Sequence, residues 1–430
     1  MSTPCPILGK GEKEGLSKLL RDAIDANKIP ATFIGVTTAQ ETLFSDCAGD
    51  IVCGVPGSGL VDPDTTVQLF SATKFVTTVA CLQLVDQGRV SLDDPEYINR
   101  YLPELAELKI LKGYTPEGEA ITVDQNPKGA ITLRMLLSHT SGLSYGWQND
   151  VGRWLTEAGK RPLGFLAADA SIDDYIYPLV TQPGTDYNYG IGLDWAAFLL
   201  ERVTGENISD YYRKHIFEPC DMRSTGFLPT AAIKDKLMRM TYYKDDHTPA
   251  AYNNSFTDGL LPRPEDPDTM GTVFSGGGGL FSTAKDYLAF LRGVLASCFR
   301  LRAEDSAIHP LLSDASFQEL FTNVLTPKGK KSLVEAMKLQ TYHAPELLQD
   351  ASGRDVGHSV GLCLNHKDSS VGRKAGSGCW DGAAKTQYWL DPETGIAAVC
   401  FSNIFAPNPC PFMQFYNEYE TALYQALTRG

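Results

Sequence analysis

Apolar residues near the N-terminus follow helical spacing first and strand-like alternation afterwards. Helical spacing is set by Leu16, Leu19, Leu20, Ala23 and Ile24. The β-branched run at residues 31–36 then alternates as a strand does, and a turn near Gln40 can return a second strand. The pattern predicts a helix followed by a strand pair.

The C-terminal part predicts a hairpin and a closing helix. Two apolar runs, residues 386–390 and 396–401, flank the turn sequence Asp391-Pro392-Glu393-Thr394-Gly395. Apolar residues then recur at helical spacing from Phe412 to Leu427. The polar, Pro/Gly-rich stretches at residues 113–129 and 262–267 predict loops.

Strands and helices thus gather at both ends, with mostly helical and loop-rich sequence between them. We therefore expect an α/β fold with two lobes, for which 430 residues suffice. Residues 1–95 and 275–430 would form a discontinuous lobe around the central sheet, and residues 96–274 a mostly helical lobe.

Composition narrows the classes of partner. The chain is 43% hydrophobic and 21% charged, as globular proteins are, and 38 basic against 52 acidic residues give a net charge of −14. Scattered lysines and arginines argue against nucleic acid as a partner. The sequence has no apolar run long enough to predict a membrane span, and no apolar stretch after Met1 of the kind that predicts a secretory signal. We therefore expect a cytoplasmic protein. Metal and nucleotide motifs are missing, and we expect no cofactor.

One candidate for catalysis is the SxxK sequence Ser71-Ala72-Thr73-Lys74, which precedes the apolar segment 75–85. Residues i and i+3 share a face of a helix, so Lys74 can reach the Ser71 hydroxyl. A lysine held at the start of a buried helix is desolvated and near the positive end of the helix dipole, and both effects lower its pKa. The alternative is a serine that only caps the helix.

Two other serines also match catalytic patterns. Ser282-Thr283-Ala284-Lys285 repeats SxxK, but Thr283 and Asp286 fit a capping box and indicate a helix start. Gly357-His358-Ser359-Val360-Gly361 matches the nucleophile elbow of α/β-hydrolases, yet a strand-like segment follows it, and no acid stands between Ser359 and the last histidine, His366. We expect neither serine to be the nucleophile.

Other segments of the chain favour Ser71 through a family resemblance. The successive motifs are Ser71-x-x-Lys74, the run from Ile131 to Tyr145, Pro183-Gly184-Thr185-x-x-x-Tyr189, and Gly276-Gly277-Gly278-Gly279-Leu280. In this order they resemble the class C β-lactamase superfamily over nearly the whole chain. Within it, Leu143-Ser144-Tyr145 and the segment 189–195 are most similar to family VIII carboxylesterases and to the fungal transesterase that acylates monacolin J.

The resemblance implies a β-lactamase/transpeptidase-like fold, with an antiparallel sheet flanked by helices, and a serine acyl-transfer enzyme. By the same resemblance Ser71 is the nucleophile, Lys74 and Tyr189 share the base role, and Tyr145 lines the site. Tyr187 is a competing register for Tyr189. A phenol titrates near about 10, and a neighbouring lysine ammonium is expected to favour its phenolate.

Two departures from class C β-lactamases bear on the substrate. Tyr189 is followed by Gly190-Ile191 instead of x-Asn, and Trp380-Asp381-Gly382 stands where those enzymes carry Lys-Thr-Gly. Lys385-Thr386 is followed by Gln387 and does not restore that motif. Penicillin turnover is therefore disfavoured. Related esterases resemble this chain in their tryptophan, which puts Trp380 and Gly382 at the acyl pocket and makes the backbone N–H groups of Ser71 and Ala383 the oxyanion hole.

The expected substrate is a small carboxylic ester or thioester, with water, an acceptor alcohol or an acyl-carrier partner in the second half-reaction. β-Lactamase or penicillin-binding activity, or a non-catalytic protein of the same fold, are the alternatives. A Ser/Lys/Tyr mechanism needs no histidine, so we expect a structural role for His139. Several aromatic residues either wall an apolar pocket or pack in the core: Tyr145, Trp147, Trp154, Phe165, Tyr175 and Tyr177.

Overall fold

The centre of the protein is a seven-stranded antiparallel sheet, seen in a computed structural model that describes residues 6–148, 150–161, 169–227, 233, 235–252, 273–303, 308–339 and 355–429. The strand order is β10-β11-β12-β13-β14-β2-β3. In chain order the strands are β2 (Thr32–Thr37), β3 (Thr42–Ala48), β10 (Val356–His358), β11 (Cys363–Asn365), β12 (Gly378–Trp380), β13 (Thr386–Asp391) and β14 (Ile396–Phe401). β14 pairs with β2, so segments from the two ends of the chain meet in the middle of the sheet.

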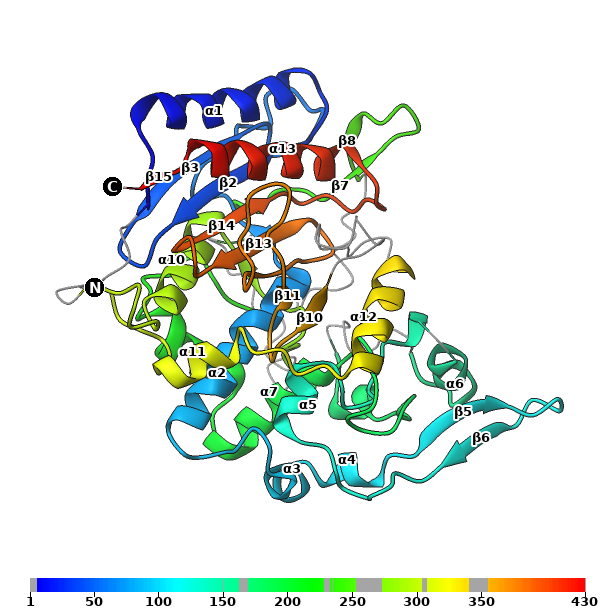
Figure 1. Cartoon of the computed structure of the whole chain (residues 1–430). Coiled ribbons are helices and arrows are strands. Elements are labelled where there is room, and N and C mark those ends of the chain that lie inside the picture. The colour runs from blue at the N-terminus through cyan, green and yellow to red at the C-terminus, as the bar shows by residue number, and fades with distance from the viewer. Residues whose placement is uncertain are drawn as a thin grey trace.

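Helices cover both faces of this sheet (Figure 1). α1 (Lys10–Asp25) and α13 (Pro411–Ala426) lie on one face, and α10 (Ala284–Leu295) and α2 (Thr73–Asp86) lie on the other. α1 turns Leu16, Leu20 and Ala23 inward, which explains its helical spacing of apolar residues. β1 (Pro6–Ile7) pairs with β15 (Thr428–Arg429), so the two ends of the described chain lie together.

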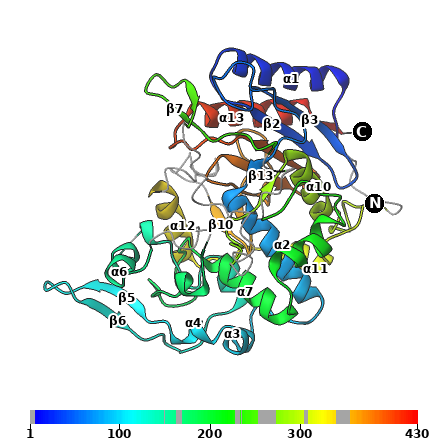
Figure 2. The ribbon, with the colours of Figure 1, turned by 180° about the vertical axis from the view of Figure 1, so that it is seen from behind.

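A second group of helices lies beyond α2, on the side away from the sheet (Figures 1 and 2). The remaining helices outside the sheet layers are α3 (Pro95–Tyr101), α4 (Pro103–Glu107), α5 (Leu133–Leu137), α6 (Val151–Glu157), α7 (Gly192–Thr204), α8 (Ile208–Tyr212), α11 (Asp314–Glu319) and α12 (Pro327–Leu339). α7 packs against α2, which is why α2 is apolar nearly all round. The boundaries of the two lobes, at 95/96 and 274/275, stay a prediction.

The sequence prediction of the main elements is confirmed, with one error. The expected helix, strand pair, hairpin and closing helix are α1, β2–β3, β13–β14 and α13. The expected loop at residues 113–129 is partly wrong, because β5 (Ile110–Tyr114) and β6 (Ala120–Val123) form a hairpin that projects from the body. All four residues of β6 are exposed, so no core-facing pattern marks it as a strand. The other expected loop, 262–267, lies outside the described residues.

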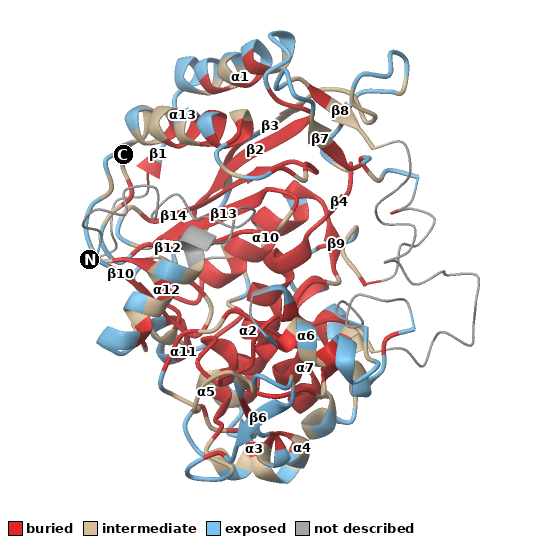
Figure 3. Cartoon of the chain, turned by 90° about the vertical axis from the view of Figure 1, so that its right-hand side faces the viewer, coloured by how far each residue is buried: buried red, intermediate tan, exposed pale blue. Residues whose placement is uncertain are grey.

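The buried interior runs from the sheet through α2 into α7 (Figure 3). Every residue of β13 and β14 is buried. Two short strands pair with each other, β4 (Val67–Gln68) just before α2 and β9 (Phe281–Ser282) just before α10. None of the helices in the described ranges combines the length and apolar character needed to cross a membrane.

Candidate active site

Ser71 lies in a tight turn between β4 and α2. The turn is the 3-10 segment η1 (Phe70–Ala72), and Phe70 adopts a φ of +46°, which is uncommon for a bulky residue. The turn is fixed from both sides, since the Leu69 N–H donates to the Leu280 carbonyl at 2.9 Å and Tyr287 Oη donates to the Ala72 carbonyl at 2.9 Å. α2 begins with Ala72 as its N-cap and without a side-chain cap, so the helix-cap alternative for Ser71 is not what the structure contains.

The structure brings Ser71, Lys74 and Tyr189 together. Lys74 Nζ donates to Ser71 Oγ at 3.1 Å, one helical turn away, and Tyr189 Oη donates to Ser71 Oγ at 2.8 Å. All three side chains are buried. Tyr187, the competing register, points its ring at His139 and His358 instead, with ring centroids 5.7 and 5.4 Å away.

Tyr189 is placed by two loop segments that hydrogen-bond to each other. The Tyr145 N–H donates to the Tyr189 carbonyl at 3.1 Å, and the Asn188 N–H donates to the His139 carbonyl at 2.7 Å. A Cβ at Gly190 would lie 2.5 Å from the Cα of Ser144, so only glycine allows this approach. The glycine after Tyr189 is therefore required for the packing of these two segments.

Lys74 has three acceptors for its ammonium group. Besides Ser71, Nζ donates to Tyr145 Oη at 2.9 Å and to the Gly277 carbonyl at 2.7 Å. Burial lowers the pKa of Lys74 to about 8, while the charges of Asp194 and Asp381 act to raise it. The expected lowering is confirmed, and a substantial neutral fraction exists at mildly alkaline pH.

The expectation for the Tyr189 phenol is wrong in direction. Burial raises its pKa above the ordinary value, and this effect outweighs the hydrogen bond with Ser71 that lowers it. Tyr189 is therefore a neutral hydroxyl that donates to Ser71 at neutral pH. Burial cannot be read from the sequence motif, which is why the prediction failed.

Tyr145 does more than line the site, because it accepts a hydrogen bond from Lys74 directly. Its ring stacks on that of Trp147, with centroids 4.2 Å apart and planes 11° from parallel. Trp147 is 54% exposed. Of the aromatic residues expected to wall a pocket, Tyr175 and Tyr177 are buried in the core and Phe165 lies outside the described residues.

The loop after β12 lies against the Ser71 turn. A Cβ at Gly382 would lie 2.0 Å from the Leu69 carbonyl oxygen, and Thr386 Oγ1 donates to the same oxygen at 2.9 Å. Ala383 packs against the small cluster of Phe70, Met240 and Ala384. The turn that precedes Ser71 and the loop around Ala383 are thus in contact.

The ring of Tyr189 contacts two aromatic rings and His139, and a second histidine lies beyond Trp380. Trp380 lies 5.4 Å from Tyr189 and His139 4.7 Å, measured between ring centroids. His139 Nδ1 accepts a hydrogen bond from the Gly190 N–H at 3.3 Å, which agrees with a structural role. Sequence analysis did not single out His358 as a site residue. Its ring lies 5.4 Å from that of Trp380, and burial lowers its pKa to about 4.

The other three sequence matches to catalytic motifs, at Ser282, Ser359 and Lys385, have structural contacts instead. Thr283 caps α10 by accepting from the Asp286 N–H at 3.0 Å, as predicted. Ser359 is fully buried in the turn between β10 and β11, where its Oγ accepts from the Leu362 N–H at 3.0 Å. Lys385 is buried and donates to Asn408 Oδ1 at 2.8 Å.

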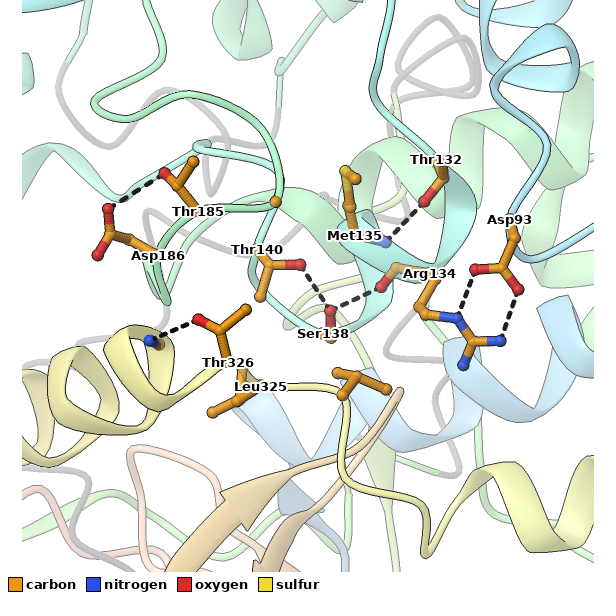
Figure 4. A pocket seen from close by; sticks show the side chains of 13 residues that line it. Asp93, Thr132, Arg134, Met135, Ser138, Thr140, Thr185, Asp186, Leu325 and Thr326 are labelled. Carbon is orange, nitrogen blue, oxygen red and sulfur yellow. Dashed lines mark hydrogen bonds and ion pairs between the residues drawn. The ribbon is translucent and has the colours of Figure 1, made fainter.

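A pocket of about 250 Å³ lies beside the loops that hold His139 and Tyr189 (Figure 4). It opens between α5, the turn at residues 184–186 and the chain entering α12. Its charged side chains already have partners, since Arg134 pairs with Asp93 at 2.6 Å and Asp186 with Lys328 at 2.8 Å. None of Ser71, Lys74 and Tyr189 lines it. In the described part of the chain no cluster of three or more metal-ligating side chains occurs.

An antiparallel sheet between helical layers, with this arrangement of loops, is the β-lactamase/transpeptidase-like fold. Unliganded LovD, the simvastatin synthase of Aspergillus terreus, has the same fold, with a TM-score of 0.79 at 23% identity over 97% of this chain and 99% of that one. The chain belongs to the Beta-lactamase family, which it matches over residues 16–423.

Curated relatives of this family narrow the class further. The chain is 29% identical to a lovastatin esterase of Penicillium rubens over 388 residues, 88% of this chain and 89% of that protein. It is 28% identical to a monacolin J acid methylbutanoyltransferase of Aspergillus terreus over 421 residues, 95% of each chain. The family resemblance and the fold expected from the sequence are confirmed, and the chain is an acyl-transfer enzyme of β-lactamase type.

Proposed function

We propose that this protein is a serine esterase and acyltransferase that forms a covalent acyl-enzyme on Ser71. The single observation that carries the proposal is the pair of hydrogen bonds at Ser71 Oγ, 3.1 Å from Lys74 Nζ and 2.8 Å from Tyr189 Oη. The substrates are small carboxylic esters or thioesters, and the acyl group passes to water or to an acceptor alcohol.

In the first half-reaction neutral Lys74 takes the Ser71 proton as Oγ attacks the carbonyl carbon. The carbonyl oxygen becomes an oxyanion held by the backbone N–H groups of Ser71 and Ala383. When the tetrahedral intermediate collapses, the bond to the leaving oxygen or sulfur breaks. The leaving group takes the proton back from Lys74 by way of the Tyr189 hydroxyl.

In the second half-reaction water or an alcohol gives its proton to the same pair, Tyr189 and Lys74, and attacks the acyl carbon. Ser71 regains its proton as the acyl group leaves. The raised pKa of Tyr189 and the lowered pKa of Lys74 support this division of roles between them, in which the phenol relays protons and the amine holds them. Trp380 and Gly382 would line the acyl pocket, with Tyr145 at its edge.

The names of the relatives, a lovastatin esterase and a monacolin J acid methylbutanoyltransferase, support an ester such as lovastatin as acyl donor and an acceptor such as monacolin J acid. A direct test measures p-nitrophenyl butyrate turnover with and without an added primary alcohol. The proposal expects a butyrate ester of the alcohol alongside free butyrate, with both lost in Ser71→Ala. Turnover that persists in Ser71→Ala would refute it.

A further inference from the structure

Asp194 is a carboxylate with no exposed surface, located behind Lys74 in the first turn of α7. Its Oδ1 accepts from Ser275 Oγ at 2.7 Å and from the Gly277 N–H at 2.9 Å. Its Oδ2 has no hydrogen-bond partner within the described part of the chain. A buried carboxylate with an unpaired oxygen is costly unless a positive charge compensates it.

Gly277 joins this carboxylate to Lys74. The N–H of Gly277 points to Asp194, and its carbonyl oxygen accepts from Lys74 Nζ at 2.7 Å. A Cβ at Gly277 would lie 2.6 Å from Asp194 Oδ2, so the glycine is required for the approach of the two charges. The glycine run 276–279 therefore has a steric reason at this position.

Lys74 is the cation that acts on Asp194. It is the charged group that lowers the pKa of the Asp194 carboxyl against the effect of burial, and Asp194 in turn acts to raise the pKa of Lys74. The other titratable groups that act on one or both of them are Tyr145, Tyr175, Tyr177, Tyr189, Tyr212, His139 and Asp381. The tyrosines are neutral near pH 7, because burial raises their pKa values.

We propose that ionised Asp194 is the counter-ion of Lys74, a positioning residue that orients the amine through Gly277 and stabilises the proton it takes from Ser71. This inference rests on the proposed function, since it assigns Lys74 the base role. The cation that forms during acylation then finds its compensating charge already in place, without movement of solvent. The cost is a smaller neutral fraction of Lys74 at pH 7.

The test is the pH dependence of Ser71 labelling by a fluorophosphonate, followed by intact mass. Labelling requires neutral Lys74, so its rate rises with pH through the Lys74 pKa. In Asp194→Asn the positive form of Lys74 loses its counter-ion, and we expect the midpoint to move to lower pH by about one unit. The rate at the alkaline plateau should fall, because Lys74 becomes a weaker base.

Asp286→Asn is the matched control. Asp286 is also buried and also accepts from a backbone N–H, that of Ser224 at 2.8 Å, but it is not among the charges that act on Lys74. Its substitution should leave the midpoint in place. Asp194→Ser provides a second variant if Asp194→Asn does not fold, because it removes the same negative charge, and it should move the midpoint in the same direction.

The outcomes separate the two proposals. Wild type that is not labelled on Ser71 overturns both. If labelling is lost in Ser71→Ala but its midpoint is unchanged in Asp194→Asn, or in the substitute Asp194→Ser, the counter-ion inference alone is overturned. A lower labelling rate with an unchanged midpoint also overturns the counter-ion inference, because this is the result expected if Asp194 has only a structural role.

Discussion

The hydroxyl of Tyr189 donates a hydrogen bond to Ser71 Oγ, at 2.8 Å. Because Tyr189 supplies its own proton to that contact, the Ser71 proton must go to another acceptor. Lys74 Nζ, 3.1 Å from Ser71 Oγ, is in position to accept it when neutral. The directions of the two pKa shifts agree with this reading, since burial favours a neutral amine and a neutral phenol.

Tyr189→Phe removes this donor and keeps the ring. We expect kcat/KM for p-nitrophenyl butyrate to fall by about 10²–10⁴, the usual contribution of a positioned acid–base group. Tyr187→Phe is the control, because the Tyr187 hydroxyl has no hydrogen-bond partner among the described residues. Equal losses in the two variants would contradict the assignment of Tyr189.

Activity should follow the protonation state of Lys74. Since its pKa is lowered to about 8, kcat/KM should rise with pH up to that value and level off above it. The base is the neutral form, so acid removes it. Initial rates between about pH 6 and pH 10 measure this profile, and a rate that is constant from about pH 6 to pH 9 would exclude Lys74 as the base.

Gly382→Ala tests the loop that carries Ala383. The new Cβ would lie 2.0 Å from the Leu69 oxygen, so the loop must move away from the Ser71 turn. Loss of one oxyanion donor costs about 10²–10³ in kcat, and we expect a fall of this size. Gly226→Ala is the control, since a Cβ there meets nothing within 4 Å. Unchanged activity in Gly382→Ala would remove Ala383 from the oxyanion hole.

β-Lactam turnover should be weak. The family resemblance predicts that Trp380 takes the place of the lysine in Lys-Thr-Gly, and the nearby Lys385 is buried and donates to Asn408 Oδ1. An exposed cation for the β-lactam carboxylate is thus missing from this motif. We expect nitrocefin hydrolysis to be slower than p-nitrophenyl butyrate hydrolysis by about 10–10², because a hydrogen bond to a charged group contributes about 1.5–3 kcal/mol and this contact is missing. Comparable rates would favour the β-lactamase alternative.

The sequence predicted the parts of the site that local pattern controls. Ser71 and Lys74 are one helical turn apart at the start of a helix that is plainly apolar, whereas the preference for Tyr189 over Tyr187 came from the spacing after Pro183-Gly184-Thr185 in the family that the chain resembles. The elements of the sheet were predictable for the same reason, because β2, β13 and β14 are apolar and well bounded.

Features that depend on distant contacts were not predictable. Asp194 and Lys74 are joined by their hydrogen bonds to the N–H and the carbonyl of Gly277, which is far from both in the sequence. His358 contacts Trp380 from a different strand. The direction of the Tyr189 pKa shift depends on how deeply the phenol is buried, which no motif encodes. Strand β6 of the β5–β6 hairpin has no buried residue, and the glycines of the hairpin resemble those of a loop.

The most direct test of the central claim is intact-mass spectrometry after mixing with p-nitrophenyl butyrate and, separately, with a fluorophosphonate. Wild type, Ser71→Ala and Ser359→Ala are compared, and peptide mapping locates the adduct. We predict one adduct, on Ser71, in wild type and in Ser359→Ala, and none in Ser71→Ala. An adduct that survives in Ser71→Ala, or no adduct in wild type, would contradict the account of Ser71 as the nucleophile.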